Sequence, residues 1–167
     1  MKRFALPGLF FAALIAFCLG AGQAGAMSSS SSGGGASSSA DSAWGQARKA
    51  IAAKDYDAAV PLLKQAVAED PKNADAYNYL GYTHARQGNS DAALGYYKQA
   101  LAIEPEHKGA NEYLGELYLK MDNLAAAEER LAVLDKACFF GCTEYDLLKA
   151  AVKRYKADGK FTSSKGL

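Results

Sequence analysis

Residues 74–107 read ADAYNYLGYTHARQGNSDAALGYYKQALAIEPEH, and they describe one helical hairpin almost completely. Gly81 is the most informative position, because a glycine inside a helix costs about 1 kcal/mol relative to alanine. Its presence predicts a close helix–helix contact that a side chain would block. The positions that mark the first helix, the second helix and the end of the hairpin are Tyr77, Leu80, Gly81 and His84; Ala93, Tyr97 and Ala100; and Pro105.

This spacing resembles the tetratricopeptide repeat, whose 34-residue pattern is W-x2-L-G-x2-Y, then A-x3-F, then P. In this sequence Tyr77 takes the Trp position, His84 the Tyr position and Tyr97 the Phe position. The resemblance implies an all-α fold, a right-handed α-solenoid of helix-turn-helix hairpins. It also implies a surface that binds a protein or a peptide.

Neighbouring segments repeat the pattern with the same period. Pro71 and Pro105 lie 34 residues apart, and Leu114-Gly115 follows Leu80-Gly81 at the same offset. We therefore expect a repeat domain over residues 41–158, with hairpins at about 40–73, 74–107 and 108–138. The first helix of the first hairpin departs most from the pattern, as terminal repeats do when one face must meet water.

A further helix is expected after the third hairpin. Tyr145, Leu148, Val152 and Tyr155 form one apolar stripe at helical spacing, and Gly159 ends it. Thr143 offers an N-cap. This helix, over residues 143–158, would cap the last hairpin, and residues 159–167 would form a disordered tail.

The N-terminal residues are expected to direct export. Residues 1–26 combine Lys2-Arg3, an uncharged apolar run and Ala24-Gly25-Ala26, the pattern of a cleavable signal peptide. Residues 27–40, MSSSSSGGGASSSA, would form a flexible linker. These features predict a periplasmic or secreted protein. A retained membrane anchor and a lipoprotein signal at Cys18 are the alternatives.

The charge balance gives no argument for nucleic acid or an anionic membrane as a partner. Without Lys2 and Arg3 the chain holds 17 basic and 18 acidic residues, a net charge of about −1. No block of like charge is present, so we expect no nucleic acid and, after signal cleavage, no membrane.

Cys138 and Cys142 carry the strongest chemical signal. Because Cys18 would leave with the signal, the exported chain would keep an even pair, which is expected to form a disulfide in an oxidising compartment. Phe139 or Phe140 would then plug the core. The alternative is a thiol-redox or Cu(I)-handling assembly factor, since thiolates favour Cu(I).

Enzymatic chemistry has little support in the sequence. No nucleophile elbow, zinc-protease helix, P-loop or dinucleotide motif occurs, and no cofactor or bound metal is expected. Glu112 and Glu116 share a helix face at i, i+4, which is more typical of solvated charge than of a carboxylate pair. The chain is expected not to be an enzyme.

The resemblance places a partner-binding groove on the first helix of each hairpin. The candidate residues combine aromatic rings with charges of both signs, a composition that often carries interface energy. A groove that holds a C-terminal carboxylate would need more basic residues in the third hairpin. The sequence therefore predicts a non-enzymatic adaptor for an unidentified partner, with these groove residues: Trp44, Arg48, Asn78, Tyr82, Arg86, Glu112, Glu116 and Lys120.

Overall fold

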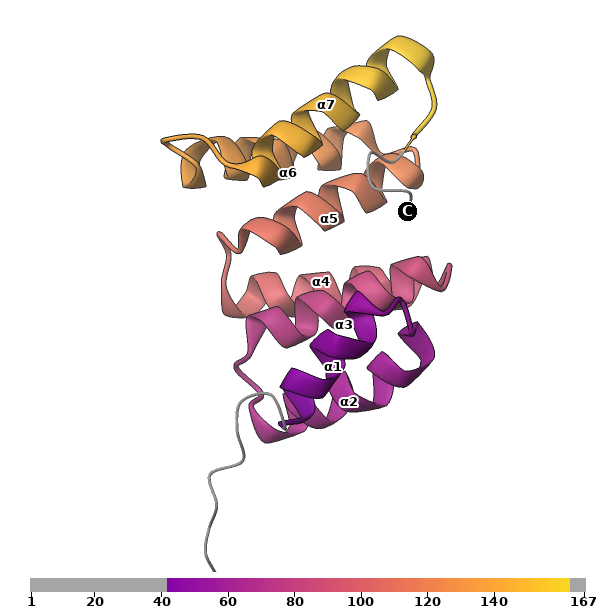
Figure 1. The fold of residues 1–167 in the computed structure, drawn as a ribbon. Coiled ribbons are helices and arrows are strands. Elements are labelled where there is room, and N and C mark those ends of the chain that lie inside the picture. Colours follow the sequence, from indigo (N-terminus) through magenta and orange to yellow (C-terminus); the bar gives the residue numbers. More distant parts are fainter. Residues whose placement is uncertain (1–41, 163–167) are drawn as a thin grey trace, which may run out of the picture. The chain divides into compact units, whose positions relative to one another are not determined.

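The computed structural model describes residues 42–162, and every regular element in that range is an α-helix (Figure 1). The predicted signal peptide and linker, and residues 163–167 of the predicted tail, lie outside the described residues. The helices run in the order α1 (Ala43–Ala52), α2 (Tyr56–Glu69), α3 (Ala74–Arg86), α4 (Ser90–Ile103), α5 (Lys108–Lys120), α6 (Leu124–Ala137) and α7 (Thr143–Asp158).

Polar side chains begin most of the helices. The side chains of Ser42, Asp55, Asn73 and Asn123 each accept a hydrogen bond from a backbone N–H in the first turn that follows. Such caps satisfy amide groups that have no partner within the helix. The helix boundaries therefore follow from short polar residues placed between apolar stripes.

Successive helices form three hairpins: α1 with α2, α3 with α4, and α5 with α6 (Figure 1). Each hairpin turns at a residue in the left-handed backbone region, and these residues, Lys54, Gly88 and Asp122, recur at the 34-residue period. The tight turn is thus repeated even where glycine is not. The all-α solenoid expected from the sequence is confirmed.

The contact predicted at Gly81 is present inside the second hairpin. A Cβ atom on Gly81 would lie 2.6 Å from ring atoms of Tyr97, which is fully buried. The absence of a side chain in α3 therefore lets α4 bring its tyrosine ring against the α3 backbone. The stretch that identifies the fold therefore contains a helix contact so close that only glycine fits there.

The last helix packs against both α5 and α6 (Figure 1). A Cβ atom on Gly115 would lie 2.5 Å from the side chain of Leu148 in α7, so this glycine seats the final helix on α5. Leu148 belongs to a buried cluster with Leu119, Leu134 and Val152. The N-cap of α7 is Cys142 rather than the expected Thr143.

Candidate interaction surfaces

The eight residues predicted to line the groove divide into an accessible group and a buried group. Arg48 and Lys120 are exposed, and Trp44, Tyr82 and Arg86 are half-buried. The remaining three, Asn78, Glu112 and Glu116, are buried. The accessible part of the predicted groove therefore lies mainly on the first two hairpins.

The expectation that Glu112 and Glu116 form a solvated pair is wrong. Their exposed fractions are 1% and 0%. The reason is that α7 packs against α5, as the contact between Gly115 and Leu148 shows, and that Phe161 lines the same small cavity as Glu116. Periodicity placed both carboxylates on one face of α5, but it could not show that this face is covered.

A row of tyrosine rings links the three hairpins. The ring centroid of Tyr82 lies 6.1 Å from that of Tyr56 and 5.3 Å from that of Tyr113, and the Tyr113 centroid is 6.1 Å from that of Tyr97. Burial, followed by the hydrogen bond to Tyr56, raises the pKa of Tyr82 to about 12. Burial likewise raises the pKa of Tyr97 and of Tyr113. The hydroxyls of Tyr82, Tyr97 and Tyr113 therefore stay neutral at physiological pH.

Two arginines lie over rings on this surface. The guanidinium carbon of Arg86 is 5.6 Å from the ring centroid of Tyr56, and that of Arg48 is 5.9 Å from the ring of Trp44. These distances suit cation–π contacts. Trp44 also packs against Tyr79, with ring centroids 5.4 Å apart. The surface around Tyr82 thus combines aromatic area with positive charge.

Phe161 lies at the other end of this surface. It is half-buried, and with Ala85, Tyr97, Tyr113 and Lys120 it lines a small cavity beside Glu116. Sequence reasoning missed it, because a lone aromatic residue after a helix C-cap has no periodic pattern. Part of the predicted groove is therefore covered by the chain itself.

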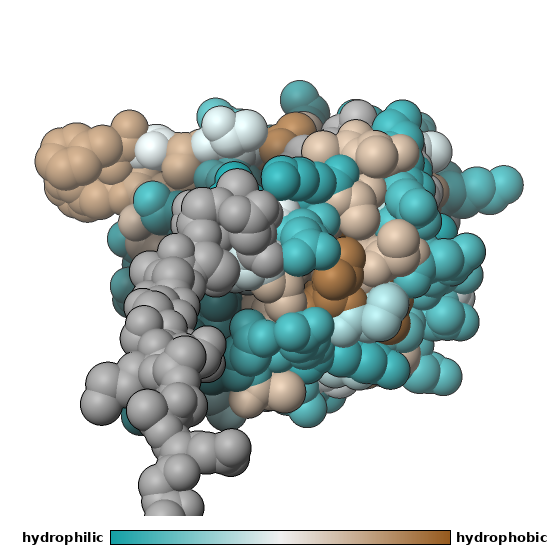
Figure 2. Space-filling model, turned by 60° about the horizontal axis from the view of Figure 1, so that its bottom comes forward, coloured by the Kyte–Doolittle hydropathy of each residue, from teal (hydrophilic) through white to brown (hydrophobic). Residues whose placement is uncertain are grey.

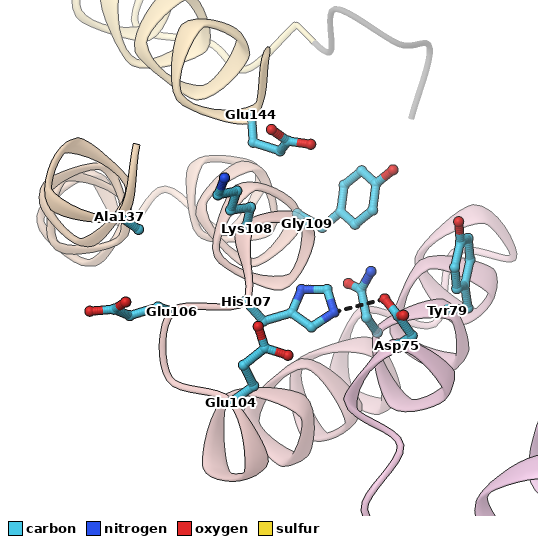
Figure 3. Close-up of a pocket in the computed structure, with 11 residues that line it drawn as sticks. Asp75, Tyr79, Glu104, Glu106, His107, Lys108, Gly109, Ala137 and Glu144 are labelled. Atoms are coloured by element: carbon cyan, nitrogen blue, oxygen red, sulfur yellow. Dashed lines mark hydrogen bonds and ion pairs between the residues drawn. The ribbon is translucent and has the colours of Figure 1, made fainter. Parts of the chain in front are cut away.

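A second surface, an acidic hollow, lies where α3, the α4–α5 connection and α7 meet (Figure 3). Its volume is about 560 Å³, and His107 forms part of its wall. His107 Nδ1 accepts a hydrogen bond from the Ala110 N–H at 3.1 Å, so Nε2 donates to Asp75 at 3.0 Å. His107 is therefore both the N-cap of α5 and a link to α3. The lining residues include the carboxylates of Asp75, Glu104, Glu106 and Glu144, together with Lys108.

The side chains between Cys138 and Cys142 point in the direction opposite to the one expected from the sequence. Phe139 and Phe140, one of which was expected to plug the core, are 85% and 97% exposed. The structure joins the two cysteines, whose Cα atoms are 5.5 Å apart, and both pack against the buried cluster of α7. With both ends turned inward, the chain reverses at Gly141, whose φ is +86°, and the phenylalanines point outward.

The two rings form an apolar projection. They meet edge to face with centroids 5.1 Å apart. Figure 2 shows an apolar projection standing out from a mainly hydrophilic face, on the side where the α6–α7 connection lies. We call Phe139 and Phe140, with the Cys138–Cys142 turn that holds them, the aromatic knob.

The cysteines have no histidine beside them. His84 stacks on Tyr96, with ring centroids 5.3 Å apart, and His107 caps α5. Within residues 42–162 there is no cluster of three or more His, Cys, Asp or Glu side chains that could hold a metal ion. In the same range no helix is long and apolar enough to cross a bilayer.

These elements define an all-α helical-repeat protein. Two sequence profiles described as Tetratricopeptide repeat match the chain, one over residues 45–107 and the other over residues 84–152. Together they span more than half of the sequence, and the chain belongs to the tetratricopeptide repeat family. The resemblance in residues 74–107 is confirmed at the level of the family.

A solved structure supports the same fold. The crystal structure of the Sgt2 TPR domain from Aspergillus fumigatus matches with a TM-score of 0.64 and 21% sequence identity. The match covers 72% of this chain and 80% of that one. A search of curated proteins finds no match. Proteins of this repeat family generally mediate protein–protein interactions.

Proposed function

We propose that this protein is a non-enzymatic adaptor that binds a peptide or protein partner across the first helices of its hairpins. The observation that carries the proposal is the half-buried cluster of Tyr82, Tyr56 and Arg86, which joins neighbouring hairpins through ring and cation–π contacts. Tyrosine, tryptophan and arginine are the residue types that most often carry binding energy.

The accessible part of the groove favours an acidic or aromatic segment as the ligand. Arg48 and Arg86 supply positive charge, and Trp44 and Tyr82 supply partly exposed ring area. Planar guanidinium groups bind carboxylates in a bidentate way and also stack on rings. The buried Glu112 and Glu116 are not available to such a ligand.

The double variant Tyr82→Ala/Arg86→Ala should reduce partner capture from periplasmic extract by at least about tenfold, because both changes remove central contacts. Lys98→Ala/Gln99→Ala, at exposed positions of α4, is the matched control and should capture normally. Circular dichroism checks that both variants keep their helices. Capture that survives in the first variant at full helicity would exclude this surface.

We further propose export with cleavage after residue 26 and a disulfide between Cys138 and Cys142 in the exported protein. The signal-like pattern of residues 1–26 supports the first proposal, and the paired positions of the cysteines support the second. Intact-mass measurement of the protein recovered from cells tests both. A mass that retains residues 1–26 contradicts cleavage, and a mass with two additional hydrogens contradicts the bond.

A further inference from the structure

The aromatic knob needs an explanation apart from the groove. Two adjacent phenylalanines, 85% and 97% exposed, stand on a turn whose ends are both anchored in the core. The Gly141 N–H donates a hydrogen bond to the Cys138 carbonyl oxygen, at 2.7 Å, and closes the turn. Rigid aromatic side chains lose little conformational freedom on binding, so a constrained turn is well suited to present them.

The charges around the knob are predominantly negative. Ala137, which immediately precedes the turn, and Glu144, two residues after it, also line the acidic hollow, so the knob and the hollow adjoin each other. Figure 3 shows Glu144 across from Lys108 and Gly109, with Glu104 and Glu106 near His107 on the α4–α5 connection. Across the hollow and the two helix turns that flank the knob, six carboxylates stand against two lysines: Asp75, Glu104, Glu106, Asp135, Glu144 and Asp146 against Lys108 and Lys136.

The hollow also contains a hydrogen-bond acceptor that no group within residues 42–162 uses. Asn78 lines it and is 4% exposed, and its Oδ1 atom has no hydrogen-bond partner within the described residues. A buried amide oxygen without a partner is unfavourable, and a donor from a ligand would satisfy it. Lysine and arginine side chains bring donors and the charge opposite to the surrounding carboxylates.

We propose that the aromatic knob and the acidic hollow form a second docking surface, for a protein that offers an apolar stripe bordered by lysine or arginine. The rings would pack on the stripe while the basic side chains enter the hollow. Six neighbouring carboxylates disfavour the surface of an anionic membrane. This surface borders the predicted groove at Asn78, but it is built on the knob and the acidic hollow and not on the cluster of Tyr82, Tyr56 and Arg86. It therefore does not depend on the proposed function.

A labelled 18-residue helical peptide with a leucine face and a lysine face serves as the probe, and its counterpart carries glutamate in place of lysine. Fluorescence anisotropy with the full chain should show binding of the lysine peptide only. This binding should weaken between 50 and 200 mM salt, because the Debye length falls below about 10 Å within roughly this range and the charges are screened. Equal binding of the glutamate peptide would overturn the proposed charge complementarity.

The variant Phe139→Ala/Phe140→Ala should weaken binding of the lysine peptide by at least about tenfold. This variant should fold normally because both phenylalanine side chains are exposed. Ile103→Ala/Met121→Ala changes other exposed apolar residues and should bind as the unchanged protein does. Unaltered binding by the phenylalanine variant would overturn the proposal.

The acidic hollow is tested separately. Glu144→Gln/Asp146→Asn should weaken the lysine peptide several-fold, whereas Asp57→Asn/Asp91→Asn, at exposed sites in α2 and α4, should change it little. If both double variants lost the same affinity for the lysine peptide, the effect would come from the net charge of the protein, and this result would contradict a specific site. Tyr82→Ala/Arg86→Ala should leave binding intact, which separates this surface from the groove.

Vesicle flotation distinguishes a lipid surface from a protein partner. The full chain should not float with phosphatidylcholine vesicles or with vesicles that also contain phosphatidylglycerol. Flotation that is lost in Phe139→Ala/Phe140→Ala would assign the knob to a membrane and overturn the proposal.

Discussion

His84 combines partial burial with a titratable ring. Burial, followed by the charge of Lys64, lowers the pKa of His84 below its usual value of about 6.5. The unfolded chain therefore takes up a proton at this histidine at a higher pH than the folded chain does. This difference lowers the free energy of unfolding as the pH falls below about 6.5, and it has no effect at pH values well above 6.5.

The variant His84→Phe keeps a ring against Tyr96 but cannot be protonated. Its free energy of unfolding should fall less steeply between about pH 7 and pH 5 than that of the unchanged protein. Urea titrations at several pH values measure the two slopes. Because both proteins keep His107, the comparison isolates His84, and identical slopes would contradict the assigned cause.

At the scale of the element, two glycines in helices have opposite roles. Gly81 in α3 faces the buried Tyr97 ring at a distance that leaves no room for a methyl group. Gly95 in α4 is exposed, and nothing lies within 4 Å of its Cβ position. Gly81 is therefore required by packing, while Gly95 only adds freedom to the unfolded chain.

Gly81→Ala should lower the free energy of unfolding by about 1–3 kcal/mol, because a fully buried ring has little space to move. Gly95→Ala should raise it by about 0.5–1 kcal/mol, the usual gain from alanine within a helix. Urea unfolding of both variants checks the two signs. A stabilising Gly81→Ala would show that the α3–α4 contact is looser than described.

The hairpins could be predicted from the sequence because their evidence is local and repeated. Gly81, Pro71 and Pro105 mark the period, and the helices lie where it places them. The covering of Glu112 and Glu116 could not be predicted, since it depends on how α7 lies on α5. The outward direction of Phe139 could not be predicted either, because the cysteines and not the phenylalanines occupy the core position.

At the scale of the whole molecule, the seating of α7 closes one end of the helix stack. Gly115→Ala should lower the free energy of unfolding by about 1–3 kcal/mol, because the new methyl group meets the buried Leu148. Hydrogen exchange should then speed up in α7 more than in α3 and α4.

The partner change Leu148→Ala supplies the control for this seating. It creates a cavity by itself, but combined with Gly115→Ala it also removes the clash. The double variant should therefore lose less stability than the two single losses added together. Simple additivity in a double-mutant cycle would contradict direct contact between these positions.

The position of Phe161 changes how any affinity for the groove must be interpreted. A ligand side chain that enters the groove beside Tyr113 and Leu117 meets the ring of Phe161, which already occupies this place. The observed dissociation constant of such a ligand is the intrinsic constant divided by the fraction of molecules in which the Phe161 ring has moved out of the groove. The chain thus carries its own competitor, at a concentration fixed by the few residues that join it to α7.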